Sequence, residues 1–456
     1  MAKKKQIELT IKEKLQNALV PKEEQPYKIP NNWCWTRLTF LSDLLTGNSI
    51  NAKEKENKYM NLSEGYNYIA TKDISFNSNI NYNNGVKIPF ENNFKIAKKN
   101  SSLLCIEGGS AGRKIGFLNQ DVCFVNKLCA FYPIKIEAKY LFYFLQSPIF
   151  NISFKEKMNG LIGGVSVAKL KDIPIILPPI NEQQRIVNRI ESLFVKLDRA
   201  KELIENTLAQ FEQNKMAILH KAFTGELTVK WRKENNIDLS SWKEKTIDEL
   251  CTSLKYGTSK KSKPEGSVVV LRMGNLQNGE IDWSNLMYTD DKDDIEKYLL
   301  KKGDVLFNRT NSPELVGKTS IYRGEYPAIY AGYLIKLDYG KDIIGEYLNY
   351  MMNSTKAKHY CYTVKTDGVS QSNINAKKIG AFEIPVPTIE EQQEIVNILD
   401  KLLAKYNKIK NLEQQLEKIE LLKKAILAKA FRGELGTNNP DEESAENLLK
   451  EILAEK

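Results

Sequence analysis

The stretch NSPELVGKTS, residues 311–320, ends in Gly-Lys-Thr, as a phosphate-binding P-loop does. In a P-loop the lysine contacts the phosphates, and glycines let the backbone fold closely around them. The motif needs a further glycine five residues before Gly317, but Ser312 stands there, and the following Pro313 has no N–H to donate. The next residues, SIYRGEYPAIYAGYLIKL, are typical of strands rather than of the helix that a P-loop begins. A true P-loop is therefore disfavoured, and the alternatives for Lys318 are an ordinary charged loop and a loop that contacts some other phosphate.

Other reactive side chains are scarce. The sequence has two histidines and six cysteines, and no two cysteines form a Cys-x-x-Cys pair. Histidine-based catalysis, zinc binding and a disulfide framework are therefore not expected, and we predict no catalytic or metal-binding residue. No apolar run reaches membrane-spanning length, and the N-terminal stretch is too polar for a secretory signal. These features favour a cytoplasmic protein with no membrane contact.

The charge of the chain is uneven. The 456 residues carry a formal net charge of +10, and 42% of them are hydrophobic, as in globular proteins of two or three domains. Residues 1–180 hold 25 basic and 15 acidic side chains, a difference of +10, so the excess lies in the first part of the chain. A basic surface suggests a polyanionic partner.

An internal repeat organises the sequence. LPPINEQQRIVNRIESLF, from Leu177, matches VPTIEEQQEIVNILDKLL, from Val386, at a shift of 209 residues. Further along, AILHKAFTGELT, from Ala217, matches AILAKAFRGELG, from Ala425, at a shift of 208 residues. One residue is therefore missing from the second copy between these two matches.

Between the matches, apolar residues recur at spacings of three and four in both copies, which is typical of a coiled-coil stripe. The copies differ where Ala200 is followed by Ile204 but Ile409 by Leu412, which places the missing residue in mid-helix. Each copy predicts a helix of about 38 residues, roughly 57 Å long at 1.5 Å per residue. A pseudo-twofold relation between the copies would make the two helices pack antiparallel.

The segments that precede the helices also correspond at their ends, where each has a tryptophan-led start and a Gly-Val-Ser stretch, but their interiors differ. We therefore predict an α+β fold in which two globular domains are separated by two long helices that form an antiparallel coiled coil. The expected order is an N-terminal helical segment (1–26), domain 1 (27–180), helix 1 (181–227), domain 2 (228–386), helix 2 (387–436) and a C-terminal helical tail (437–456). The N-terminal segment and the tail are both amphipathic, and they either pack together or remain free.

This arrangement resembles the specificity subunit of type I DNA restriction–modification enzymes. The likeness rests on LPPINEQQRIV and VPTIEEQQEIV at the helix starts, KAFTGEL and KAFRGEL at their ends, and GDVLFNRTNSPELVGK, GVSQSNINAKKIG and YKIPNNWCWTRL. It covers nearly the whole chain, and the doubled order makes it specific.

The resemblance implies a non-catalytic subunit with two target-recognition domains, each of which reads one half of a split, asymmetric site in double-stranded DNA. The helices would fix the spacing of the half-sites and bind two modification subunits, which carry S-adenosylmethionine and the methylation chemistry. Restriction subunits would add ATP-driven translocation and cleavage, with Mg²⁺. This chain itself would bind no cofactor. It contains neither a Gly-rich methyltransferase loop nor an Asn/Asp-Pro-Pro-Tyr/Phe tetrapeptide.

Candidate DNA contacts are polar residues in glycine-marked loops and after strands, because phosphates attract Lys and Arg while base edges pair with Arg, Asn and Gln. Under the family resemblance, Lys318 more readily meets DNA than a nucleoside triphosphate. The candidates are Lys72, Arg113, Lys114, Ser166, Arg272, Asn275, Arg309, Asn311, Lys318, Ser370 and Gln371.

Candidate partner contacts lie at the helix starts and comprise Glu182, Gln183, Gln184, Glu391, Gln392 and Gln393. Two other functions remain open. A coiled-coil scaffold whose flanking domains bind proteins predicts no salt-dependent DNA affinity. A nucleotide-dependent DNA enzyme built around Lys318 predicts nucleotide binding by the isolated chain, and the missing glycine argues against it.

Overall fold

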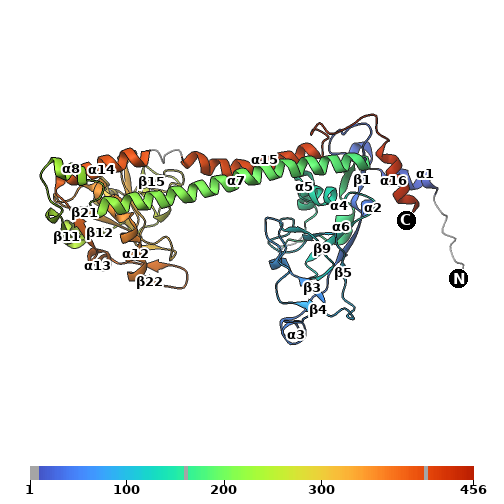
Figure 1. Cartoon of the computed structure of the whole chain (residues 1–456), viewed down its shortest axis with the longest axis horizontal. Helices are drawn as coiled ribbons and strands as arrows, with labels where there is room; N and C mark the ends of the chain where they lie inside the picture. The colour runs from blue at the N-terminus through green and yellow to red at the C-terminus, as the bar shows by residue number, and fades with distance from the viewer. Residues whose placement is uncertain (1–9, 159–162, 405–408, 456) are drawn as a thin grey trace. The chain divides into compact units, whose positions relative to one another are not determined.

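The computed structural model of the chain describes residues 10–158, 163–404 and 409–455 (Figure 1). It divides into unit 1, which combines Met1–Leu203 with Gln414–Lys456, and unit 2, which is Ile204–Glu413. Two helices contribute residues to both units, α7 (Ile180–Phe223) and α15 (Ile409–Ala430). Within the described residues, no helix is both long and apolar enough to cross a membrane.

Unit 1 contains two four-stranded sheets. The first is antiparallel in the order β2-β9-β6-β7, and the second has the order β4-β3-β8-β5, with β3 and β8 parallel. A further antiparallel pair, β1·β10, joins the beginning and the end of the domain. The strands are β1 (Cys34–Arg37), β2 (Ser42–Thr46), β3 (Tyr66–Ile69), β4 (Lys87–Ile88), β5 (Ile96–Ala97), β6 (Ser102–Cys105), β7 (Ile115–Phe117), β8 (Val122–Phe124), β9 (Leu128–Pro133) and β10 (Pro174–Leu177).

Unit 2 repeats this topology. Its antiparallel sheet has the order β12-β21-β17-β19, β13 lies parallel to β20 and antiparallel to β16, and β11·β24 closes the domain. The central segments of the two domains therefore share one fold, although their sequences differ. The strands are β11 (Lys243–Thr246), β12 (Cys251–Tyr256), β13 (Val268–Leu271), β14 (Leu276–Gln277), β15 (Glu280–Ile281), β16 (Tyr288–Thr289), β17 (Val305–Asn308), β19 (Thr319–Ile321), β20 (Ala328–Tyr330), β21 (Leu334–Tyr339) and β24 (Glu383–Val386).

Each unit also contains shorter helices. Those of unit 1 are α1 (Ile11–Ala18), α2 (Leu38–Leu41), α3 (Ala52–Lys58), α4 (Ala138–Phe144), α5 (Pro148–Glu156), α6 (Val167–Lys171) and α16 (Ala445–Ala454). Those of unit 2 are α8 (Val229–Glu234), α9 (Ile247–Leu250), α10 (Lys292–Tyr298), α11 (Gly345–Met352), α12 (Thr355–Val364), α13 (Ala376–Gly380) and α14 (Ile389–Ala404).

Helix α7 has 44 residues, more than the roughly 38 that the apolar stripe predicts, because it begins six residues before the stripe does. Within unit 1 it packs antiparallel to α15. Lys201 pairs with Glu420 at 3.1 Å, whereas the earlier Asp198 pairs with the later Lys423, whose ammonium also lies 5.3 Å from the ring centre of Phe194. The predicted antiparallel packing is therefore confirmed in unit 1.

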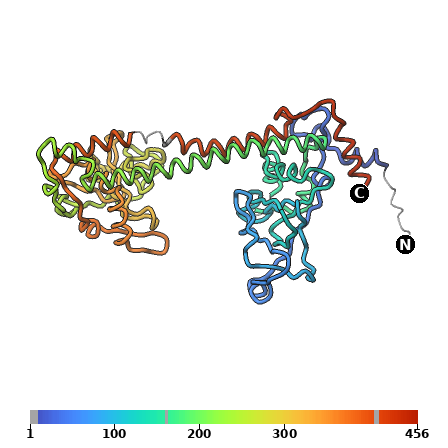
Figure 2. Tube along the Cα trace, in the orientation of Figure 1, coloured from blue at the N-terminus to red at the C-terminus, as the bar shows by residue number. Residues whose placement is uncertain are grey.

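In unit 2, the C-terminal part of α7 lies beside α14 (Figure 2). Leu219 and Ala222 of α7 share a core with Ile395, Val396 and Leu399 of α14. The second repeat helix was expected to be continuous. The structure describes it as α14 and α15, and residues 405–408 lie outside the described residues.

The repeated KAF motif anchors each helix end to a domain. Phe431 is fully buried, with its ring 5.2 Å from Tyr140 and 5.4 Å from Phe144. At the matching position in the other repeat, Phe223 lies 5.3 Å from Tyr347. Burying one such ring stabilises its contact by about 1.5–3 kcal/mol.

The first and last described helices, α1 and α16, meet in unit 1. Ala18 of α1 belongs to the same buried cluster as Leu449, Ile452 and Leu453 of α16, so the two terminal helices pack together. Nearby, the Tyr27 hydroxyl donates to the backbone oxygen of Phe431 at 2.8 Å. Of the two arrangements left open for the terminal segments, the structure has the packed one.

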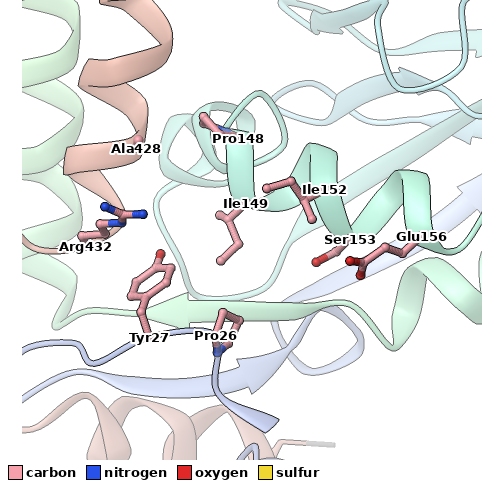
Figure 3. A pocket seen from close by; sticks show the side chains of 9 residues that line it. All are labelled: Pro26, Tyr27, Pro148, Ile149, Ile152, Ser153, Glu156, Ala428 and Arg432. Atoms are coloured by element: carbon pink, nitrogen blue, oxygen red, sulfur yellow. The ribbon is translucent and has the colours of Figure 1, made fainter.

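A hollow of about 270 Å³ lies where the N-terminal segment, α5 and α15 meet in unit 1 (Figure 3). Ile149 and Ile152 of α5 line one side. On the other, the Arg432 guanidinium lies 5.3 Å from the ring centre of Tyr27. The hollow is mostly apolar and carries no cluster of catalytic side chains.

Candidate nucleic-acid interface

The Gly317-Lys318 turn does not have P-loop geometry. Gly317 has φ +95°, and a Cβ there would lie 2.8 Å from the Cys361 sulfur, so glycine is needed for local packing. The backbone N–H of Asn308 donates to the Lys318 carbonyl at 2.8 Å, and the chain continues directly into β19. A P-loop leads into a helix instead, so the argument against a P-loop is confirmed.

Lys318 has a counterpart in unit 1, Lys114. The Lys318 ammonium donates to Gln277 Oε1 at 2.8 Å, and the Lys114 ammonium donates to the Thr71 carbonyl at 3.1 Å. In unit 2, Lys318 thus joins the start of β19 to the segment that follows β13. In unit 1, Lys114 joins the start of β7 to the segment that follows β3. Partial burial lowers the pKa of Lys318.

Four candidate residues lie together around one small sheet of unit 2, which we call the edge sheet: β18 (Thr310–Asn311), β23 (Ser372–Asn373) and β22 (Thr366–Asp367). Asn311 lies in β18, and Arg309 immediately precedes it. Ser370 and Gln371 are exposed in the β22–β23 turn, where Val369 is also fully exposed. The edge sheet thus presents polar and apolar groups at one place, as a reader of base edges requires.

Arg309 is held in a defined position at the edge sheet. Its guanidinium lies 4.8 Å from the ring centre of Tyr256 and donates to Asn373 Oδ1 at 3.2 Å and to the Gly332 carbonyl at 3.3 Å. Its Nε is buried and has no partner. An arginine fixed in this way loses little conformational freedom when it pairs with a base or a phosphate.

In unit 1, Arg113 and Lys114 form a second basic group around an exposed ring. Their charged ends lie 5.0 and 5.2 Å from the ring centre of Phe76, which is 59% exposed. Lys72 is exposed on the same turn as Thr71, to which Lys114 bonds. Three candidates therefore share one patch. The sequence analysis missed Phe76 and Tyr256, because each ring is far in sequence from the arginine that covers it.

Asn275, which was predicted as a DNA contact, is held inside unit 2. It is 3% exposed, accepts from the Arg272 N–H at 2.9 Å and donates to the Asp282 carbonyl at 2.9 Å. Asp73 has the same role in unit 1, where it accepts from the Ala70 N–H at 2.8 Å. Arg272 is half-buried, and its guanidinium donates to the Asn285 carbonyl at 3.0 Å.

Ser166 caps helix α6. The repeat alignment placed the Gly-Val-Ser stretch of Ser166 opposite that of Ser370, and the structure shows that these two positions do not correspond. The Ser166 hydroxyl accepts from the Lys169 N–H at the start of α6, as Asn375 accepts from the Lys378 N–H at the start of α13. Ser166 therefore corresponds to Asn375. The Gly-Val-Ser stretch of unit 2 lies instead in the β22–β23 turn of the edge sheet.

Two of the four glutamines predicted to bind partners, Gln183 and Gln392, make their hydrogen bonds inside the chain. Gln183 is fully buried, accepts from the Glu137 N–H at 2.9 Å and donates to the Pro178 carbonyl at 3.0 Å. Gln392 is also fully buried and makes the corresponding bonds, from the Ile344 N–H at 2.8 Å and to the Pro387 carbonyl at 3.0 Å.

The glutamates beside them are also fully buried. Glu391 accepts from Thr228 Oγ1 and Arg232 at 2.6 Å each, and from Trp242 Nε1 at 2.9 Å. We call these four residues the Glu391 clamp. Glu391, which was predicted to bind a partner subunit, is thus enclosed by residues of its own chain.

Glu182 makes the corresponding contacts in unit 1. It is fully buried and accepts from Thr437 Oγ1 at 2.6 Å and from Arg185 Nε at 2.9 Å, and Arg185 also pairs with Glu442 at 2.6 Å. Burial raises the pKa of Glu182, and the bonds from Thr437 and Arg185 oppose that rise. Of the six predicted partner contacts, Gln184 and Gln393 are exposed.

No group of three or more His, Cys, Asp or Glu side chains within the described part of the chain could hold a metal ion. The described cysteines are free, and five of the six are buried. The two units thus share one fold but differ in their basic surface groups, which are Arg113 and Lys114 in unit 1 and Arg309 in unit 2.

Comparison with known proteins identifies the family. The model of the type I restriction modification DNA specificity domain matches residues 30–212 and again residues 240–421. The chain belongs to this family. It is a DNA-recognition specificity subunit of a type I restriction–modification system, with one target-recognition domain in each unit.

Similar proteins carry the same designation. The EcoKI specificity subunit of Escherichia coli K12 is 30% identical over 324 residues, which cover 66% of this chain and 69% of that protein. The StySPI specificity subunit of Salmonella potsdam is 26% identical over 462 residues, 94% of this chain and 96% of the relative. A chain solved in work on the assembly and conformational transition of the type I R-M system has the same fold, with a TM-score of 0.66 at 19% identity over 90% of this chain and 100% of that chain.

Proposed function

We propose that each unit of this specificity subunit reads one half of a bipartite, asymmetric site in double-stranded DNA. The observation that carries the proposal is the doubled fold with unlike surfaces. Unit 2 presents Arg309 and the β22–β23 turn, whereas unit 1 presents Phe76 between Arg113 and Lys114. Equal frameworks with different surface groups suit two readers of different base sequences.

We further propose that the chain is non-catalytic and works in a complex. Two modification subunits would bind along the repeat helices and supply S-adenosylmethionine and methyl transfer, and restriction subunits would supply ATP- and Mg²⁺-dependent cleavage. The exposed Gln184 and Gln393, at matching positions on α7 and α14, support two equivalent docking places. The complex would work in the cytoplasm, where its DNA is.

Exchange of one recognition domain tests the division of the site. Residues 243–386 begin in β11 and end in β24, which pair antiparallel with Lys243 opposite Val386, so the segment starts and ends at one place. Replacing it with the equivalent segment of a relative is expected to change one half-site and preserve the other. Sequencing of methylated sites in cells that carry the exchanged gene provides the measurement, and a change in both half-sites would contradict independent reading.

Arg309→Ala tests the edge sheet alone. We expect it to lower discrimination at one base pair of the unit 2 half-site by about 1–3 kcal/mol, because a bidentate arginine–guanine pair contributes that much. The control is Arg323→Ala, since Arg323 is an arginine of the same unit that is not a candidate DNA contact and already pairs with Glu280 at 2.8 Å. Binding to a panel of single-base variants gives the answer, and equal profiles for the two variants would exclude a base-reading role for Arg309.

A further inference from the structure

A cavity of about 370 Å³ in unit 2 brings three lysines together from three separate elements. Lys215 comes from α7, Lys318 from the loop that follows the edge strand β18, and Lys358 from α12. The repeat helix α7 and the recognition domain of unit 2 thus both line this cavity.

The ammonium groups of these lysines have no carboxylate partner among the described ion pairs. Lys318 donates to the neutral amide of Gln277, and Lys358 lies 3.9 Å from the sulfur of Met216. Glu212 and Glu314 also line the cavity, which leaves three positive groups against two negative ones. Although much of its side chain is exposed, partial burial and then the neighbouring charge of Lys215 lower the pKa of Lys358, and the charge of Glu212 opposes this shift. Unpaired, partly desolvated cations favour an anionic ligand.

The cavity lies directly beside the edge sheet. Pro313 lines it and stands two residues after Asn311 of β18, a chain distance of at most about 7 Å. Duplex DNA carries one phosphate charge per roughly 1.7 Å of its axis, so a duplex read by the edge sheet has phosphates within reach of the cavity. Contacts to phosphates fix the register in which neighbouring side chains read bases.

We propose that this cavity binds one phosphate group of the DNA backbone beside the half-site that unit 2 reads, through Lys215, Lys318 and Lys358. The inference rests on the proposed function and deepens it, because through Lys215 the repeat helix α7 would itself contact the DNA. The phosphate fixes α7 and the recognition domain against the same point of the duplex. This contact would fix the register in which the base-reading side chains of unit 2 meet the DNA.

The test is Lys358→Gln in the full chain, assembled with its modification subunits. Removing one phosphate contact makes the negative slope of log K against log salt shallower by about 0.9. At about 0.15 M salt this corresponds to about a fivefold loss of affinity. The loss is the same for cognate and single-base variant sites, since phosphate contacts carry no base information. Lys356→Gln is the matched control, because Lys356 lies on the same helix but pairs with Glu244 at 3.3 Å and does not line the cavity.

Single methylphosphonate substitutions in the DNA locate the phosphate. One neutral position should reproduce the loss with the unaltered protein and cause no further loss with Lys358→Gln. Equal salt slopes for Lys356→Gln and Lys358→Gln, or additive losses at every methylphosphonate position, overturn the proposal. If inorganic phosphate or ATP binds in a Lys358-dependent way while DNA affinity stays unchanged, the site takes a free anion and the DNA assignment is wrong. Failure of the unaltered complex to select a bipartite site would instead refute the proposed function.

Discussion

Replacing Arg232 by methionine is expected to destabilise unit 2 by about 3–5 kcal/mol, because the buried carboxylate of Glu391 then loses its cation. Both side chains of the pair are nearly or fully buried, with exposures of 8% and 0%, so water cannot take the place of the guanidinium. The remaining donors of the Glu391 clamp, Thr228 and Trp242, are neutral and only partly compensate. The loss would also loosen the start of α14, on which Glu391 lies.

Hydrogen exchange followed by mass spectrometry measures this effect separately in the two units. Amides of unit 2 should lose protection, and those of unit 1 should keep it. The matched control is Arg185→Met in unit 1, where the arginine side chain is 37% exposed and a smaller change is expected. The double variant Arg232→Met/Glu391→Leu should recover much of the stability, because it removes both charges. A loss below about 1 kcal/mol in the single variant would mean that the clamp does not hold unit 2 together.

Adding one heptad to each repeat helix is expected to move the DNA half-sites apart, with no change in the bases that are read. The insertions belong after Leu203 and after Glu413, where the boundary between the units crosses the two helices. Seven residues keep the apolar stripe in phase and lengthen each helix by roughly 10 Å at 1.5 Å per residue. Since a DNA strand rises 3.4 Å per base pair, the spacing could grow by up to about three base pairs.

Methylation mapping of a genome that carries the altered gene is the measurement. A heptad in only one helix leaves the pair unequal and should abolish methylation. Two added residues per helix rotate the stripe by about 200° and should do the same. A folded, active double-heptad variant that methylates the original sites would show that the helices do not set the spacing.

The repeat and its helices could be predicted because their evidence is periodic and redundant. The matches at Leu177 and Val386 lie 209 residues apart, and the stripe residue Leu197 recurs as Tyr406 in the second copy. Antiparallel packing was predicted from the pseudo-twofold relation of the copies. In unit 1 the ion pairs that join Asp198 and Lys201 to α15 confirm it. The common topology of the two domains could not be predicted, because their strands are short and share little sequence.

The roles of particular polar residues were harder to predict, since a polar residue near a helix start is usually exposed. Gln183 and Gln392 are fully buried because backbone groups of the adjacent domain satisfy their amides, and such partners are invisible in the sequence. Asn275 is buried for a similar reason. By contrast, Lys318 was correctly separated from a P-loop, because one missing glycine and one proline decide that question locally.

Unit 1 joins an early and a late segment of the chain, which has a consequence for synthesis. Unit 2 is one continuous segment, Ile204–Glu413, so all its contacts can form as soon as that segment has left the ribosome. Unit 1 needs Phe431, whose carbonyl accepts from Tyr27 across 404 residues, and Asn439, whose carbonyl accepts from Asn32. Contacts of such long sequence separation form slowly. The domain that is translated first is therefore completed last, and the emerging chain must keep its apolar surfaces soluble until Phe431 and Asn439 have been made.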